Sequence, residues 1–376
     1  MKPWKSALWS DADLEESIMC RLGSALLPPL LSSVLEEAAS RDEVVDLVIA
    51  PAAQVAWVPF GLLAWGGQAP DLPQRAENRG ARRRGSTRVL EAARVRLAPS
   101  AALVCGLAAR SAPAPPTGIR RPVVVSVLDP TSDLPNARGV PSGTQRLLGG
   151  RAVVERGAVV TEVHLAVRDE LRQVLEEVSV GTLEHRGVLV YRGHASSPAP
   201  GRTAGAALAL ADGDVTAKDL LTWAQESPGL IPDRVLLAGC ASLGAAHGGA
   251  EWMSLAPAAL VSGATAVVAT SWALLDHPIA TEVEQEIVAV LRTADDVAGG
   301  LRALQCRWLE RWRTARVHVA SGRVEQPAAA RPPLIWAAFA LVAVSGSSDE
   351  LRSSRPTNPV DRGDSTDGKT THGDER

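Results

Sequence analysis

The middle of the chain alternates short apolar runs with longer segments of helical periodicity. A short apolar run bounded by turn residues is typical of a buried strand, whereas apolar positions three and four apart are typical of an amphipathic helix. The pattern predicts strands at residues 123–128, 187–192, 234–238 and 265–271, and helices at 165–178, 216–226, 250–262, 277–292 and 296–313. Because such alternation builds parallel sheets, we predict an α/β fold whose mostly parallel sheet carries helices on both faces.

The start of the chain also has helical periodicity. Pro28 and Pro29 interrupt it, which predicts two short helices within residues 11–41. We assign residues 1–43 to an N-terminal helical region that covers the sheet or docks a partner.

Residues 44–344 form the predicted main domain. Its entry contains a strand at 46–50 and an extended or turn segment at 55–63. Two segments lack periodicity: residues 66–96, rich in Gly, Pro and Arg, are expected to form a flexible loop, and residues 111–122 a Pro-rich linker.

Two further segments are marked by their turn and polar residues. A hairpin is expected between residues 206–210 and Val215, turned by Ala-Asp-Gly-Asp. Residues 345–376 have few apolar side chains and are expected to form a disordered tail.

Composition limits the classes of partner. A hydrophobic content of 46% in 376 residues is ample for a buried core. With 39 basic and 42 acidic residues the net charge is −3, so no global charge attracts nucleic acid or an anionic membrane. Only four of the basic residues are Lys, which indicates a GC-rich bacterial genome rather than a binding surface.

The cysteine pattern and the hydropathy favour a cytoplasmic protein. The N-terminus turns acidic before any signal-peptide core, and the apolar segment 334–344 is far shorter than the ~20 residues that span a bilayer. The four cysteines show no paired or zinc-site spacing, so we expect neither disulfides nor a metal. They are Cys20, Cys105, Cys240 and Cys306.

Two residues capable of proton transfer and nucleophilic attack directly follow neighbouring predicted strands. His194 follows Gly193, and Cys240 follows Gly239. The carboxyl ends of parallel strands meet at one edge, which is where open α/β sheets hold active sites. A thiolate is a nucleophile and a nearby imidazole can exchange its proton. We therefore predict a cysteine peptidase in which His194 and Cys240 are catalytic.

The chain resembles the CHAT family, the caspase-like domains related to separase. His194 precedes Cys240 by 46 residues (240 minus 194), close to the roughly 50 of caspases, although the local caspase signature around the Cys is absent. The resemblance covers about residues 44–344 as an ordered set of blocks. These are residues 47–51, 58–63, 97–100, 123–137, 191–195 (YRGHA), 208–221, 235–243 (VLLAGCASL), 249–256, 263–276 and 333–342, the last expected as the final strand.

The resemblance implies a mechanism without a cofactor. Cys240 attacks the scissile carbonyl, His194 protonates the leaving amine, and the amides of Ala195 and Cys240 hold the oxyanion. The family usually has Gly after the catalytic His. Ala195 keeps the amide but would restrict a positive φ.

The resemblance also indicates a substrate pocket and a mode of control. The pocket is expected from residues 129–138 and 271–276, with Trp272 lining it and Asp129 or Asp133 receiving a basic P1 side chain. The substrate would be a protein. Since no sensing repeats are present, regulation would come from the N-terminal helices or from a regulatory or sensor protein supplied in trans.

Other interpretations of these residues are weaker. His247 is a rival base but lies in a Gly-rich segment, and Asp212 and Asp214 fit a turn better than a calcium loop, which needs more oxygen ligands. The eight Arg between positions 75 and 96 could bind RNA or form a processing site, but lack interleaved aromatic residues.

Two other functions remain to be weighed. A degenerate CHAT domain would act only as an interaction scaffold in a bacterial signalling or defence complex. An α/β-hydrolase needs a Gly-x-Cys-x-Gly elbow and a later His; the elbow is absent and His194 precedes Cys240.

Overall fold

The sheet, its covering helices and the edge that carries His194 and Cys240 are described by a computed structural model. The described residues are 12–51, 55–65, 86–98, 121–129, 131, 151–156, 159–165, 167–180, 185–196, 206–240, 242–243, 254–274, 276–320 and 332–343. They all belong to one compact unit that ends at Ser345. The predicted tail, most of the 66–96 loop and most of the 111–122 linker lie outside the described residues.

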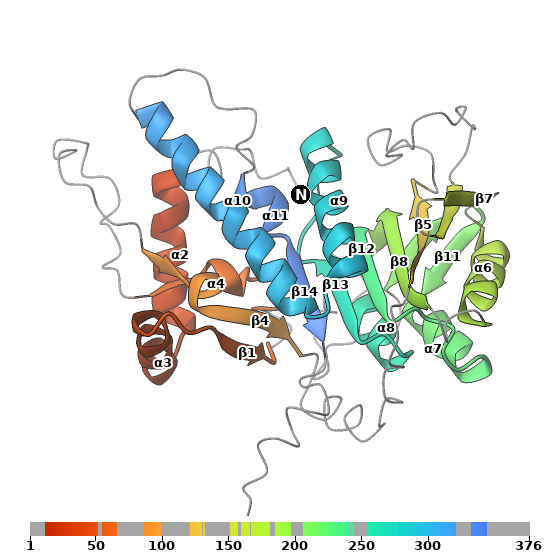
Figure 1. Cartoon of the computed structure of the whole chain (residues 1–376), viewed down its shortest axis with the longest axis horizontal. Coiled ribbons are helices and arrows are strands. Elements are labelled where there is room, and N and C mark those ends of the chain that lie inside the picture. Colours follow the sequence, from red (N-terminus) through yellow and green to blue (C-terminus); the bar gives the residue numbers. More distant parts are fainter. Residues whose placement is uncertain are drawn as a thin grey trace, which may run out of the picture. The chain divides into compact units, whose positions relative to one another are not determined.

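A mixed sheet of nine strands forms the centre of the described part of the chain (Figure 1). In spatial order the strands are β1 (Val45–Ile49), β4 (Ala93–Leu97), β14 (Phe339–Ala343), β13 (Ala266–Thr270), β12 (Arg234–Gly239), β8 (His185–Gly193), β5 (Arg121–Leu128), β6 (Arg151–Arg156) and β7 (Val159–Leu165). The first three are parallel neighbours, and so are β13, β12, β8 and β5. β14 is antiparallel to β13, β6 is antiparallel to β5, and β7 is antiparallel to β6. The predicted α/β class with a mostly parallel sheet is confirmed.

Helices cover both faces of this sheet. The chain passes from β5 to β8, β12 and β13 in one direction, and right-handed crossovers then place all connecting helices on the same face. These helices are α6 (Arg168–Val180), α7 (Ala217–Glu226) and α8 (Leu255–Val261). The opposite face is covered by α9 (Pro278–Thr293), α10 (Val297–Ala320) and the short α11 (Pro333–Trp336).

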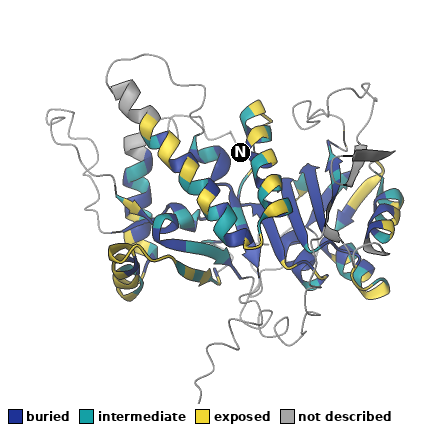
Figure 2. Ribbon diagram, viewed as in Figure 1, coloured by how far each residue is buried: buried dark blue, intermediate teal, exposed yellow. Residues whose placement is uncertain are grey.

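The two faces have separate cores because strand side chains alternate. Val235 and Leu237 of β12 pack in the core under α6, α7 and α8, whereas Leu236 and Ala238 pack in the core under α9 and α10. Figure 2 shows these central strands buried, with exposed residues along the outward sides of α9 and α10.

The N-terminal helices form as predicted, on either side of Pro28 and Pro29. They are α2 (Ala12–Leu26) and α3 (Pro29–Ser40). Leu27 and Leu35 belong to the same core cluster as the α6–α8 face. No single helix in the described part is long and apolar enough to cross a membrane; α2 and α3 reach that length only together, and they are bent by 120°.

The predicted loop at 66–96 is wrong for its final third. Residues 87–97 form β3 (Thr87–Arg88), α4 (Val89–Ala92) and β4, and β3 pairs with β2 (Ala64–Trp65). Arg88, which composition suggested was solvated, is buried in an ion pair with Glu15 at 3.2 Å. Its neighbours Val89 and Leu90 are buried too, so partners distant in sequence order this segment.

Some helices and strands begin or end at other residues than the sequence predicts. The pattern predicts no strand between residues 129 and 186, but residues 151–156 and 159–165 form the antiparallel strands β6 and β7. The helix predicted from residue 165 begins at Arg168, because β7 ends at Leu165. The segment at 55–63, predicted to be extended or a turn, contains a 3₁₀ helix, η2 (Phe60–Leu62). The block at 333–342 begins with α11 before it becomes β14.

Candidate active site

The strands that precede His194 and Cys240 end side by side. β8 and β12 are parallel neighbours over six register pairs, from Val188 with Arg234 to Gly193 with Gly239. His194 and Cys240 are therefore each the first residue beyond the last paired position, at the carboxyl edge of the sheet, and both are half-buried. The structure thus brings these two predicted residues to one place.

The backbone at His194 is held by two hydrogen bonds to its carbonyl. Its carbonyl accepts from the Ala209 N–H at 2.9 Å and from the buried Tyr191 hydroxyl at 2.6 Å. The chain then enters β9 (Ala195–Ser196), which pairs antiparallel with β10 (Ala207–Leu210). β10 in turn pairs with β11 (Gly213–Thr216), so His194 lies at the corner between the main sheet and this small one.

Ala195 is accommodated without backbone strain. Among the described non-glycine residues only Asp42 and Asp129 have positive φ, and Ala195 lies in an extended strand. The methyl group occupies space beside Gly239, where an added Cβ would lie 2.7 Å from the Cβ of Ala195. Alanine at this position thus requires glycine at position 239.

The turn that carries Cys240 is held by two buried hydroxyl residues that sequence reasoning missed. The Gly239 carbonyl accepts from the Ser242 N–H at 3.1 Å and from the Thr270 hydroxyl. The Ser242 hydroxyl donates to the Leu237 carbonyl at 2.7 Å and accepts from the Thr270 N–H at 3.0 Å. Buried hydroxyls at the ends of two apolar strands were the available signal.

A second polar cluster ties the end of β8 to α9. The buried Arg192 donates from Nε to Glu284 at 3.0 Å and from Nη1 to the Thr281 hydroxyl at 2.7 Å, and its Nη2 lies 3.7 Å from Asp276. Burial raises the pKa of Glu284 to about 8; Arg192 acts to lower it and Asp276 raises it further. The raised pKa favours the protonated form of Glu284. The signal in the sequence was an Arg within an apolar strand.

The predicted pocket residues differ in how far they are buried, and one of them lies outside the described residues. Asp129 follows β5 at the same edge, donates its N–H to the Arg192 carbonyl at 2.8 Å, and is fully buried at 0% exposure. Trp272 lies two residues beyond β13, half-buried, and its indole N–H donates to the Leu334 carbonyl at 2.9 Å. Asp133 lies outside the described residues, as does the rival base His247.

The acidic pair near the hairpin has a structural role. The β10–β11 hairpin forms as predicted, and the Asp212 carboxylate accepts from the backbone N–H of Arg168 at the start of α6 at 2.9 Å. Asp214 is paired with Ala209 in the hairpin ladder. Within the ranges that the structure describes, no group of three or more His, Cys, Asp or Glu residues is arranged to hold a metal ion.

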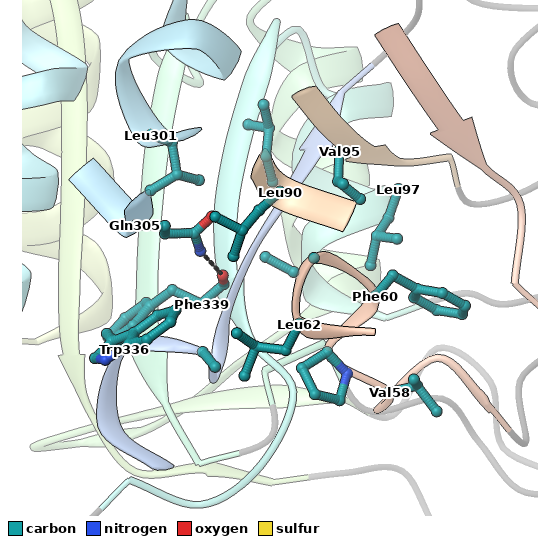
Figure 3. A pocket seen from close by; sticks show the side chains of 15 residues that line it. Val58, Phe60, Leu62, Leu90, Val95, Leu97, Leu301, Gln305, Trp336 and Phe339 are labelled. Carbon is teal, nitrogen blue, oxygen red and sulfur yellow. Dashed lines mark hydrogen bonds between the residues drawn. The ribbon is translucent and has the colours of Figure 1, made fainter. Parts of the chain in front are cut away.

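A small apolar cavity lies elsewhere, between η2, β4, α10 and α11 (Figure 3). Leu62, Leu90, Leu301 and Trp336 line it, and the Gln305 amide donates across one side to the Phe339 carbonyl at 3.1 Å. Its volume is about 40 Å³, and neither His194 nor Cys240 is among its lining residues, so it is separate from the candidate active site.

Comparison with known proteins identifies the family to which this chain belongs. No curated protein matches the chain. The family model of the CHAT domain matches residues 17–346, from within α2 to just beyond β14, and covers most of the chain. The chain therefore belongs to the CHAT domain family, whose fold is caspase-like.

Proposed function

We propose that this protein is a cysteine endopeptidase in which Cys240 is the nucleophile and His194 the proton donor. The observation that carries the proposal is the pairing of Gly193 with Gly239, which ends two adjacent strands at the same level and follows each with one of the two residues. Membership of the CHAT family supports the same chemistry.

The reaction has two stages. The Cys240 thiolate adds to the scissile carbonyl carbon, and the amides of Ala195 and Cys240 donate to the oxyanion that forms. His194 protonates the leaving amine, so that the C–N bond breaks and an acyl-enzyme remains on the sulfur. Water then adds to the acyl carbonyl, His194 takes its proton, and the thiolate leaves. No metal or organic cofactor takes part in these steps.

The substrate proposal concerns the side chain before the cleaved bond. Asp276 lies at the same edge and is part of the segment expected to line the pocket, and Asp133 belongs to the other such segment. A basic P1 residue would complement these carboxylates in charge, although Asp276 already lies 3.7 Å from Arg192 and Asp133 lies outside the described residues. Asp129 is fully buried and is the less suitable receiver. A regulatory protein supplied in trans stays a prediction.

The test is hydrolysis of fluorogenic peptides with P1 Arg, Lys, Asp or Leu by the full chain. We expect cleavage after Arg or Lys, and a loss of at least about 10³-fold in kcat/KM for both Cys240→Ala and His194→Ala. The matched control is Cys306→Ala, which removes a thiol from α10 and should keep wild-type activity. A folded wild type that cleaves none of the peptides would favour the alternative, a CHAT domain that acts only as a scaffold.

A further inference from the structure

Two peptide groups at this edge are held in the same way. The carbonyl of His194 accepts two hydrogen bonds, from the Tyr191 hydroxyl and the Ala209 N–H. The carbonyl of Gly239 also accepts two, from the Thr270 hydroxyl and the Ser242 N–H. Each carbonyl therefore has its direction fixed by one side-chain hydroxyl and one backbone amide.

Fixing a carbonyl also fixes the next N–H. A peptide group is planar, and in the trans form its C=O and N–H point in opposite directions. No cis peptide occurs among the described residues. The Ala195 N–H thus points away from Tyr191 and β10, and the Cys240 N–H points away from β13 and toward β8.

The Ala195 amide lies close to the end of β12. A Cβ placed on Gly239 would lie 3.4 Å from the Ala195 nitrogen, so this amide is close to the backbone that leads into Cys240. The amides of Ala195 and Cys240 are the two groups that hold the oxyanion in the proposed function.

We propose that the hydroxyls of Tyr191 and Thr270 are positioning groups for the oxyanion hole. The inference rests on the proposed function, since it assigns these amides a role in that reaction. Both side chains are almost wholly buried, at 1% and 0% exposure, so neither touches substrate. They act by holding the donors in place before the charge develops, which is the condition for strong stabilisation of an oxyanion.

Each hydroxyl lies within hydrogen-bond distance of the carbonyl that it is proposed to orient. Thr270 donates to Gly239, while the nearby Ser242 hydroxyl donates to Leu237 and so does not compete for that carbonyl. Tyr191 has one hydrogen, and its hydroxyl lies 2.6 Å from the His194 carbonyl against 2.9 Å from that of Ala209. The shorter contact is the one that orients the Ala195 amide.

The test uses variants that remove only the hydroxyl. Tyr191→Phe and Thr270→Val keep shape, and Thr270→Ser restores the donor. Ser262→Ala is the matched control, because Ser262 is a buried hydroxyl that donates to the Leu220 carbonyl away from this edge. We expect kcat for peptide hydrolysis to fall about 10- to 100-fold in the first two variants, as partial loss of an oxyanion donor implies. Thr270→Ser and Ser262→Ala should remain near wild type.

Two further readouts separate positioning from general damage. The inhibition constant of a peptide aldehyde, whose adduct places an oxygen in the oxyanion hole, should rise by a similar factor. The rate of Cys240 alkylation by iodoacetamide, which forms no oxyanion, should not change. Equal kcat and equal aldehyde affinity in wild type, Tyr191→Phe and Thr270→Val would overturn the proposal.

A measurement that does not depend on catalytic activity distinguishes this inference from the proposed function. Crystal structures of the variants should show the 194–195 and 239–240 peptide planes rotated from their wild-type orientations, and unmoved in Ser262→Ala. Rotated planes in a protein whose wild type cleaves nothing would refute the peptidase but keep the orienting role. Unmoved planes would refute the orienting role whatever the activity.

Discussion

Gly193 and Gly239 are register partners at the last position of β8 and β12, and Ala195 packs against the second of them. Neither glycine has a side chain to separate the strand ends. His194 and Cys240, 46 residues apart (240 minus 194), therefore follow two backbones that are in direct contact.

The contact between Ala195 and Gly239 predicts a specific intolerance. In Gly239→Ala the new Cβ would lie 2.7 Å from the Cβ of Ala195 and 3.2 Å from the Gly193 carbonyl, so the strand ends must move apart. We expect a loss of about 1 to 3 kcal/mol in the free energy of unfolding. Misplacement of Cys240 should lower kcat/KM by about 10²-fold.

The double variant is the control for that prediction. Ala195→Gly alone should keep the fold and the activity, because its backbone is extended and its amide stays. Combined with Gly239→Ala it should recover part of the lost activity, giving a non-additive cycle. Additive losses in peptide hydrolysis would show that the two positions are not coupled.

The buried Glu284 predicts a pH dependence of stability. Its pKa is raised from 4.5 to about 8, so between these values the folded protein binds more proton than the unfolded chain. The stabilising contribution of the protonated carboxyl is complete below about pH 4.5 and is lost as pH rises through about 8. Thermal melts of Glu284→Gln should show a flatter dependence across this window than wild type.

Glu177→Gln is the comparison, since Glu177 is an exposed carboxyl on α6. Its melting temperature should follow the wild-type curve at every pH. A Glu284→Gln curve parallel to wild type would mean that Glu284 does not bind the proton.

The corrected segment at 87–97 gives a stability prediction. Arg88 and Glu15 form an ion pair with 3% and 1% of their side chains exposed. Removing one partner leaves a buried charge, so Arg88→Met should cost about 3 to 5 kcal/mol in urea denaturation. Arg88→Met with Glu15→Leu should recover most of it. A solvated loop at this position would instead tolerate the single change.

Thiol reactivity should differ between the cysteines. Burial raises the pKa of Cys306, whose thiol lies 3.5 Å from the Leu90 carbonyl, and Cys20 is buried at 4% exposure. Peptide mapping after brief alkylation of the folded protein should find Cys240 modified before both. Faster modification of Cys306 would contradict this arrangement of thiols.

The sheet and the strand ends were predictable because buried parallel strands are continuous apolar runs. β8 and β12 were located from sequence, each within two residues at its ends, and were predicted to be neighbouring strands of one parallel sheet. The β6–β7 hairpin was missed since charged residues such as Glu155 and Glu162 interrupt its apolar pattern.

What the sequence did not reveal depends on partners distant along the chain. Arg88 belongs to an Arg-rich run that the sequence predicts to be solvated, and only the fold places Glu15 beside it. Thr270 and Ser242 acquire a role only when β12 and β13 lie side by side, and the Tyr191 hydroxyl only when β10 folds back over His194.

In the proposed reaction Cys240 attacks the substrate with the help of His194. The most direct measurement is the mass and site of covalent labelling by peptidyl chloromethyl ketones with P1 Arg, Lys, Asp or Leu. We predict one adduct per wild-type chain, located at Cys240, fastest with P1 Arg or Lys, slowed in His194→Ala and absent in Cys240→Ala. No adduct on the folded wild type, or an adduct that persists in Cys240→Ala, would contradict the claim.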